Sequence, residues 1–147
     1  MRNLIAAVAA LLTLAGPAWA QSQTIAWTGT VPSGEDTILS CWDTGRCAMT
    51  YGRGDDYLVV SGPYRDYGDT AFCFDVDRGE AYFADELDPE GSAQVMSAFN
   101  GRSFCFEYAA DYSYVRSPRG VVLTRNPEVE RLLEEHAVGF RGWGQRG

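Results

Sequence analysis

The chain has 147 residues, with 12 basic residues against 20 acidic ones and a formal net charge of −8. Every basic residue is an arginine, so chemistry that needs a lysine amine, such as Schiff-base formation, is excluded. The negative charge repels phosphate backbones and anionic headgroups, and we therefore expect neither nucleic acid nor a membrane surface as a partner.

Residues 1–20 have the pattern of a secretory signal peptide. Arg2 provides a positive start, residues 4–16 are mainly apolar, and residues 18–20 form a small-x-small cleavage site. The pattern predicts a Sec-type export route and a mature protein that is secreted or periplasmic. Cys41 lies far from the new N-terminus, which argues against a lipid anchor. No later segment approaches about 20 uninterrupted apolar residues, so we expect no membrane insertion.

The rest of the chain is the size of one domain, which we place at residues 21–138. It begins with a predicted strand and continues as a meander of short antiparallel strands separated by turn residues. The predicted strands are residues 24–31, 48–51, 57–61, 71–76, 80–84, 103–108 and 121–124. Residues 52–56 and 77–79 are interpreted as hairpin connections between the strands that flank them. Residues 139–147, rich in Gly and Arg, are predicted to be a flexible tail.

Four cysteines in an exported chain predict two disulfides. Cys41 and Cys47 flank an Asp-Thr-Gly turn, so they can face each other across a hairpin. Cys73 and Cys105 each sit between two phenylalanines in strand-like alternation. We therefore pair Cys41 with Cys47 and Cys73 with Cys105, and we expect the phenylalanines to belong to the core.

Two helices are predicted in the second half of the chain. The first is capped by Asp88, opens with Pro89 and ends at residues 100–101. The second is capped by Asn126 and ends at Gly139, with an apolar stripe that should lie on the sheet. These elements predict an α+β domain with a small curved antiparallel sheet or an OB-like barrel, one inserted helix, a C-terminal helix and two disulfides.

The chain offers few catalytic groups. Its only histidine, His136, falls on the stripe of the second helix, where a structural role is expected. Asp75 and Glu107 occupy equivalent positions beside Cys73 and Cys105, so the second disulfide would bring the carboxylates together. Paired carboxylates suggest a glycosidase-like secreted hydrolase as the alternative function. We expect no metal and no cofactor, and we assign no catalytic residue.

Two loops instead favour a binding role over an enzymatic one. Residues 62–69 and 111–117 combine Tyr, Arg, Ser, Gly and Asp, a composition typical of recognition loops. The sequence therefore predicts a small exported binding or inhibitor-type protein that recognises a protein or glycan partner. The residues expected to form one recognition surface are Tyr64, Arg65, Tyr67, Tyr112, Tyr114 and Arg116.

Overall fold

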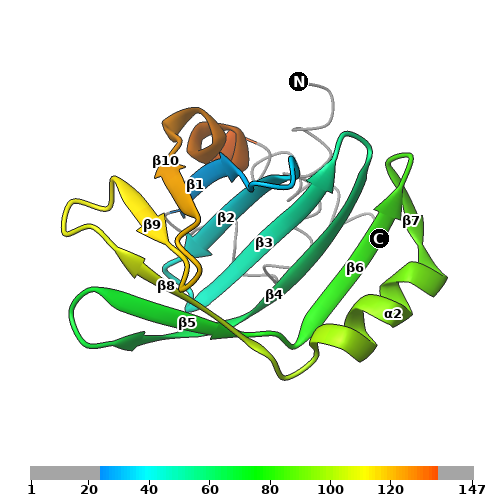
Figure 1. Cartoon of the computed structure of the whole chain (residues 1–147), viewed down its shortest axis with the longest axis horizontal. Helices are drawn as coiled ribbons and strands as arrows, with labels where there is room; N and C mark the ends of the chain where they lie inside the picture. The colour runs from blue at the N-terminus through cyan, green and yellow to red at the C-terminus, as the bar shows by residue number, and fades with distance from the viewer. Residues whose placement is uncertain (1–23, 136–147) are drawn as a thin grey trace.

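The computed structural model describes residues 24–135, and these residues form an antiparallel β-barrel with a helix on either side (Figure 1). The predicted signal peptide, His136 and the predicted tail lie outside the described residues. Eight of the described strands close the barrel, in the order β3-β2-β1-β10-β9-β8-β5-β4 with β4 paired back to β3. They are β1 (Thr24–Thr30), β2 (Asp36–Trp42), β3 (Arg46–Arg53), β4 (Asp56–Tyr67), β5 (Ala71–Asp75), β8 (Ser103–Tyr108), β9 (Tyr114–Arg116) and β10 (Val122–Arg125).

Both disulfides join residues that are directly opposite each other on neighbouring strands. Cys41 pairs with Cys47 across the β2–β3 hairpin, with their Cα atoms 4.1 Å apart. Cys73 pairs with Cys105 across β5 and β8, with a Cα separation of 4.0 Å. The predicted pairing and the predicted fold class are confirmed, and the barrel closes with eight strands.

The strand β4 differs from the prediction, because it runs without interruption through the segment interpreted as a loop. Its first part pairs with β6 (Arg78–Phe83) and its second part with β5, both along the same edge. Gly62 allows this arrangement, since a Cβ there would lie 1.5 Å from the carbonyl oxygen of Asp75. The predicted hairpin at residues 77–79 is therefore wrong: β5 and β6 follow each other along β4 instead of pairing with one another.

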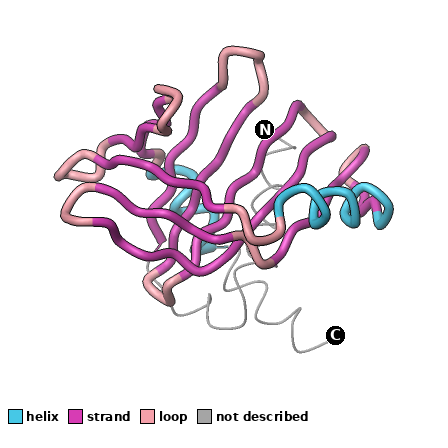
Figure 2. Tube along the Cα trace, turned by 60° about the horizontal axis from the view of Figure 1, so that its bottom comes forward, coloured by secondary structure: helices cyan, strands magenta, loops and turns pink. Residues whose placement is uncertain are grey.

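The strand β6 instead turns into β7 (Glu86–Asp88) through Ala84 and Asp85. Both turn residues have positive φ angles of 52° and 63°, which a tight hairpin of this kind requires. The chain then enters α2 (Pro89–Phe99), which packs on β6 outside the closed barrel (Figure 2). Asp88 occupies the predicted N-cap position but makes no side-chain capping hydrogen bond.

The barrel interior follows from the alternation of apolar and polar residues along each strand. Trp27, Leu39, Val60, Phe74 and Val115 are all nearly or fully buried in one core cluster. Residues at alternate positions of these strands, which face the barrel interior, belong to this cluster or pack against it. They include both pairs of phenylalanines beside Cys73 and Cys105. The expectation that these phenylalanines are core residues is confirmed.

The C-terminal helix, described over residues 127–135, lies against the outside of β1 and β10. The Asn126 side chain accepts a hydrogen bond from the Val129 amide over 3.1 Å, so the predicted cap is present. Glu130 is almost buried and accepts hydrogen bonds from the Ala26 amide and from the Arg125 guanidinium. Neither α2 nor the described part of the C-terminal helix is long and apolar enough to cross a membrane.

Candidate functional site

One end of the barrel holds a pocket of about 280 Å³ whose wall is mainly aromatic. Its inner part is formed by Trp27 and Phe72, which are 3% and 5% exposed, and by Cys41 of the first disulfide. Tyr64, Tyr108 and Tyr112 surround the mouth, and Asp66 adds a carboxylate. These residues come from β1, β2, β4, β5, β8 and the β8–β9 loop, so the closed barrel brings the pocket together.

The aromatic rings of the pocket form a continuous array around Phe72. The ring centre of Phe72 lies 6.2 Å from that of Trp27, 6.0 Å from that of Tyr108 and 6.4 Å from that of Tyr64. Tyr112 stacks on Tyr108 with ring centres 5.3 Å apart and planes inclined by 17°. Such contacts stabilise the rings in fixed positions, so the pocket is preorganised rather than assembled by side-chain collapse.

The loop between β8 and β9 is held in an unusual conformation that places Tyr112 at the pocket. Tyr112 has a φ of 61°, in the left-handed region that non-glycine residues seldom adopt. Its amide donates to the Ala109 carbonyl over 2.8 Å, and its own carbonyl accepts a bond from Trp27 Nε1 over 2.9 Å. Local strain of this kind is often found at ligand-binding sites.

The electrostatic environment of the pocket is acidic. Burial raises the pKa of the Tyr64 phenol, and the nearby carboxylates of Asp66 and Asp43 raise it further. Burial also raises the pKa of Tyr108, with added contributions from Asp66, Tyr112 and Asp69. Both phenols consequently remain protonated and neutral at physiological pH. The negative charge at the mouth comes from the carboxylates.

The structure divides the six residues predicted to bind a partner. Tyr64 and Tyr112 both line the pocket, although they are 48 positions apart in the chain. Arg65 and Tyr67 alternate with Tyr64 along β4 and therefore lie on the outer face of the barrel. There, Arg65 donates to the Tyr67 hydroxyl over 2.6 Å and forms an ion pair with Asp75.

The remaining two predicted residues lie on the outer face of β9. Val115, between them, is fully buried in the core, so Tyr114 and Arg116 point outward. Arg116 stacks over the Tyr114 ring at 5.5 Å. The strand register also aligns Tyr67 with Arg116, because the pairs Tyr67–Ala71, Ala71–Glu107 and Glu107–Arg116 form one row across four strands. The six residues thus gather at one end of the barrel, split between the pocket and the outer face.

The predicted proximity of Asp75 and Glu107 is wrong. In the antiparallel register, Asp75 is opposite Ser103 and Glu107 is opposite Ala71, on different sides of the Cys73–Cys105 bridge. Four strand positions separate the carboxylates along the strand direction, about 13 Å, beyond the spacing that glycosidases use. Asp75 instead contacts Arg65 and Ser103, and the Ser103 hydroxyl and then Arg65 lower its pKa. Glu107 lines a separate hollow that Asp75 does not share.

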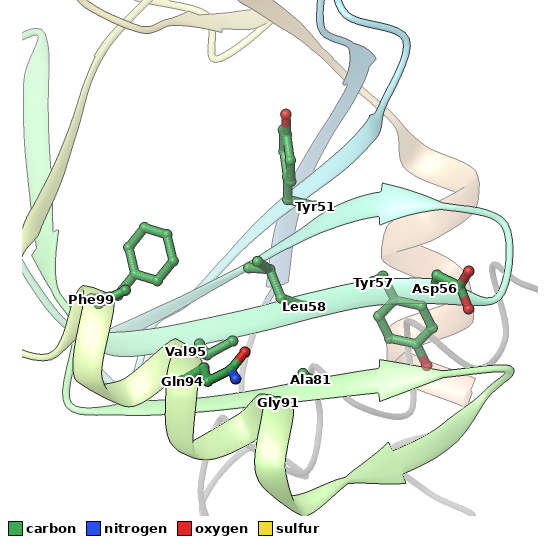
Figure 3. A pocket seen from close by; sticks show the side chains of 10 residues that line it. Tyr51, Asp56, Tyr57, Leu58, Ala81, Gly91, Gln94, Val95 and Phe99 are labelled. Atoms are coloured by element: carbon green, nitrogen blue, oxygen red, sulfur yellow. The ribbon is translucent and has the colours of Figure 1, made fainter.

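A wider groove lies between β4, β6 and α2 (Figure 3). Its volume is about 400 Å³, and Tyr51, Leu58 and Phe99 project into it from three different elements. The groove is more open than the aromatic pocket, and Asp56 and Gln94 are its main polar side chains. Val95 of α2 and Ala81 of β6 belong to its apolar lining and also to the region of the hydrophobic core.

Six of the eight residues that line the pocket are not among the predicted binding residues, and the sequence pattern bears on three of them. Tyr108 continues the inward alternation of Phe104 and Phe106, and Asp66 follows Tyr64 at the next inward position. Trp27 stands in the first predicted strand, where an aromatic residue is ordinary core material. Recognising that these inward positions share one barrel end requires the strand order, which the sequence pattern does not supply.

Comparison with protein-family models, with curated proteins and with solved structures finds no match for this chain. Within residues 24–135, no group of three or more His, Cys, Asp or Glu side chains is arranged to hold a metal ion. The geometry and chemistry of the aromatic pocket are therefore the main guide to function.

Proposed function

We propose that this chain is a small exported binding protein that recognises a group on a protein or glycan partner at the end of the barrel. The single observation that carries the proposal is the aromatic pocket, which is preformed, concave and lined by residues from six parts of the fold. The outer-face residues beside it, Arg65, Tyr67, Tyr114 and Arg116, would extend the contact surface around the rim.

The energetic balance of the pocket supports binding over a purely structural role. Tyr112 remains 43% exposed while its backbone adopts a left-handed conformation. A left-handed backbone conformation costs a non-glycine residue about 1–2 kcal/mol. Because the Tyr112 ring is only partly buried, its burial offsets only part of that cost. A partner that covers Tyr112 would bury the rest of the ring. Exposed, rigid tyrosines of this kind are common anchors in interfaces.

The proposal can be tested by nuclear magnetic resonance on the exported protein with its disulfides formed. Neutral sugars, organic cations and organic anions are added separately, and the Trp27 indole N–H resonance and the amides of residues 108–113 are followed. We expect one class of probe to shift these resonances in a saturable manner. If no probe of any class shifts them, the pocket is not a binding site and the proposal fails.

A pair of tyrosine variants separates the pocket from the rest of the surface. Tyr112→Ala should weaken the binding of the active probe by about 1–3 kcal/mol, as truncation of an interface anchor does. Tyr51→Ala is the matched control, because Tyr51 is similarly exposed, at 36%, but lines the groove beside α2. Equal effects of the two variants would contradict the proposal.

A further inference from the structure

The aromatic pocket has a chemical preference that its shape alone does not define. The faces of tyrosine and tryptophan rings carry partial negative charge and attract cations, most strongly where water is partly excluded. Trp27, Tyr64, Tyr108 and Tyr112 line this pocket from different strands and from the β8–β9 loop. A group inside would contact several aromatic rings at once.

The charged residues at the mouth of the pocket also favour a cation. Asp66 lines the pocket, Asp43 lies close enough to Tyr64 to act on its phenol, and Asp69 does the same for Tyr108. None of the ion pairs found between residues 24 and 135 includes any of these three carboxylates. Arg65, the arginine next to Asp66 in the chain, is directed to Asp75 on the opposite face of the strand.

The residues that line the pocket thus favour a positively charged group, and no cationic side chain is among them. Neutral phenols, an indole and an unpaired carboxylate attract a cation and repel a phosphate or a second carboxylate. The pocket volume of about 280 Å³ is at the small end of ligand sites, which suits a single functional group better than a whole oligosaccharide. The net charge of −8 would also steer a cationic partner toward the protein.

We infer, on the basis of the binding function proposed above, that the pocket binds an organic cation. The cation is the alkylammonium group of a lysine side chain or the guanidinium group of an arginine side chain on a partner protein. The rings of Tyr108 and Tyr112 contact the alkyl or guanidinium surface of the group. Asp66 neutralises its charge at the mouth. The outer-face tyrosines and arginines contact the surrounding surface of the partner.

The inference is tested on the exported protein with a pair of probes that differ only in charge. Choline carries a quaternary ammonium, and 3,3-dimethylbutan-1-ol has a carbon in place of that nitrogen. Titrations followed at the Trp27 indole and at residues 108–113 should show choline binding at least about tenfold more tightly, because cation–π attraction and the carboxylate act on choline alone. Nα-acetylarginine amide and Nα-acetyllysine amide, whose side chains keep their positive charge, are titrated in parallel.

Asp66→Asn removes the charge at the mouth while keeping the shape of the side chain. It should weaken choline binding about fivefold or more, whereas Glu107→Gln, an exposed carboxylate on the outer face, should change it less than about twofold. Asp66 is exposed, so a normal thermal midpoint is expected. If the variant nevertheless unfolds, the comparison of choline with its neutral isostere still tests the charge preference on the unmodified protein.

The outcomes distinguish this inference from the proposed function. Binding of the arginine or lysine amide at least as tight as that of choline supports a partner side chain, and a strong preference for choline would replace that source with a free small ammonium compound. Equal binding of choline and its isostere, or pocket binding of neutral sugars without cations, overturns the cation inference and leaves the binding function standing. No binding by any probe overturns both.

Discussion

Glu130 provides the sharpest test of how the C-terminal helix is attached to the barrel. Glu130 is 9% exposed, and its carboxylate accepts a hydrogen bond from the Ala26 amide over 3.0 Å and contacts Arg125 over 2.9 Å. Ala26 is fully buried, so replacing Glu130 by alanine leaves a buried N–H without this partner. A hydrogen bond to a charged group contributes about 1.5–3 kcal/mol, and the partly exposed ion pair with Arg125 adds up to about 1 kcal/mol.

The Glu130→Ala variant should therefore lose about 3 kcal/mol of unfolding free energy, measured by urea denaturation at neutral pH. Glu130→Gln keeps an acceptor for the Ala26 amide but not the charge, and should lose about half as much. Glu134→Ala, an exposed site on the same helix, is the control and should change stability by less than about 0.5 kcal/mol. A Glu130→Ala loss no larger than the control would refute the assigned role of this carboxylate.

Three further perturbations test other parts of the fold. Removal of the Cys73–Cys105 bridge should cost about 3.7 kcal/mol of stability, and removal of the Cys41–Cys47 bridge about 2.4 kcal/mol. The first loss is larger because 32 rather than 6 positions separate the two cysteines of that bridge. Urea denaturation of the paired Cys→Ala variants measures both losses, and the reverse order would contradict the prediction. Gly62→Ala should destabilise the protein by about 2 kcal/mol or more, since its Cβ would overlap the Asp75 carbonyl; an unchanged thermal midpoint would argue against the close approach of β4 and β5. The pKa of Tyr57 is raised to about 12, first by burial and then by Asp85 and Asp55. The contribution of its neutral phenol to the free energy of unfolding is therefore complete below pH 10 and is lost as the pH rises toward 12. Tyr57→Phe should flatten the loss of stability over that interval, and an unchanged slope of unfolding free energy against pH would count against the assignment.

Local chemistry in the sequence predicts much of this fold. The Asp-Thr-Gly turn between Cys41 and Cys47, and the matched Phe-Cys-Phe strands, correctly give both disulfides and therefore the contact between β5 and β8. Asn126 and the apolar stripe after it give the C-terminal helix. These features depend on residues close together in the chain or on a covalent link, and such signals remain visible without knowledge of the tertiary structure.

The errors come from long-range pairing. Gly62 and Pro63 have the composition of a loop, yet the barrel uses the missing Cβ of Gly62 to let another strand approach β4 closely. Asp77 and Gly79 resemble a hairpin turn, but β4 is long enough to pair with the strands on both sides of them. Asp75 and Glu107 each follow a cysteine by two positions, but β5 and β8 run in opposite directions, so the two carboxylates lie on opposite sides of the Cys73–Cys105 bridge.

The aromatic pocket was predictable only in part. The composition of their segments predicts Tyr64 and Tyr112 as binding residues, and both line the pocket. Arg65 and Tyr67 belong to the same segment, but strand alternation directs them to the outer face. Composition identifies which residues suit recognition, whereas the face each side chain occupies depends on whether the backbone is a loop or a strand.

The most direct test of the binding account is to locate a bound cation on the protein. Choline is mixed with the disulfide-bonded protein, and intermolecular nuclear Overhauser effects from the choline methyl protons to aromatic ring protons of the protein are measured. The account predicts effects to Tyr108, Tyr112 and Trp27, and their loss in Tyr112→Ala while that variant remains folded. Effects confined to Tyr51 and Phe99 of the other groove, or no effects at concentrations that saturate binding, would contradict it.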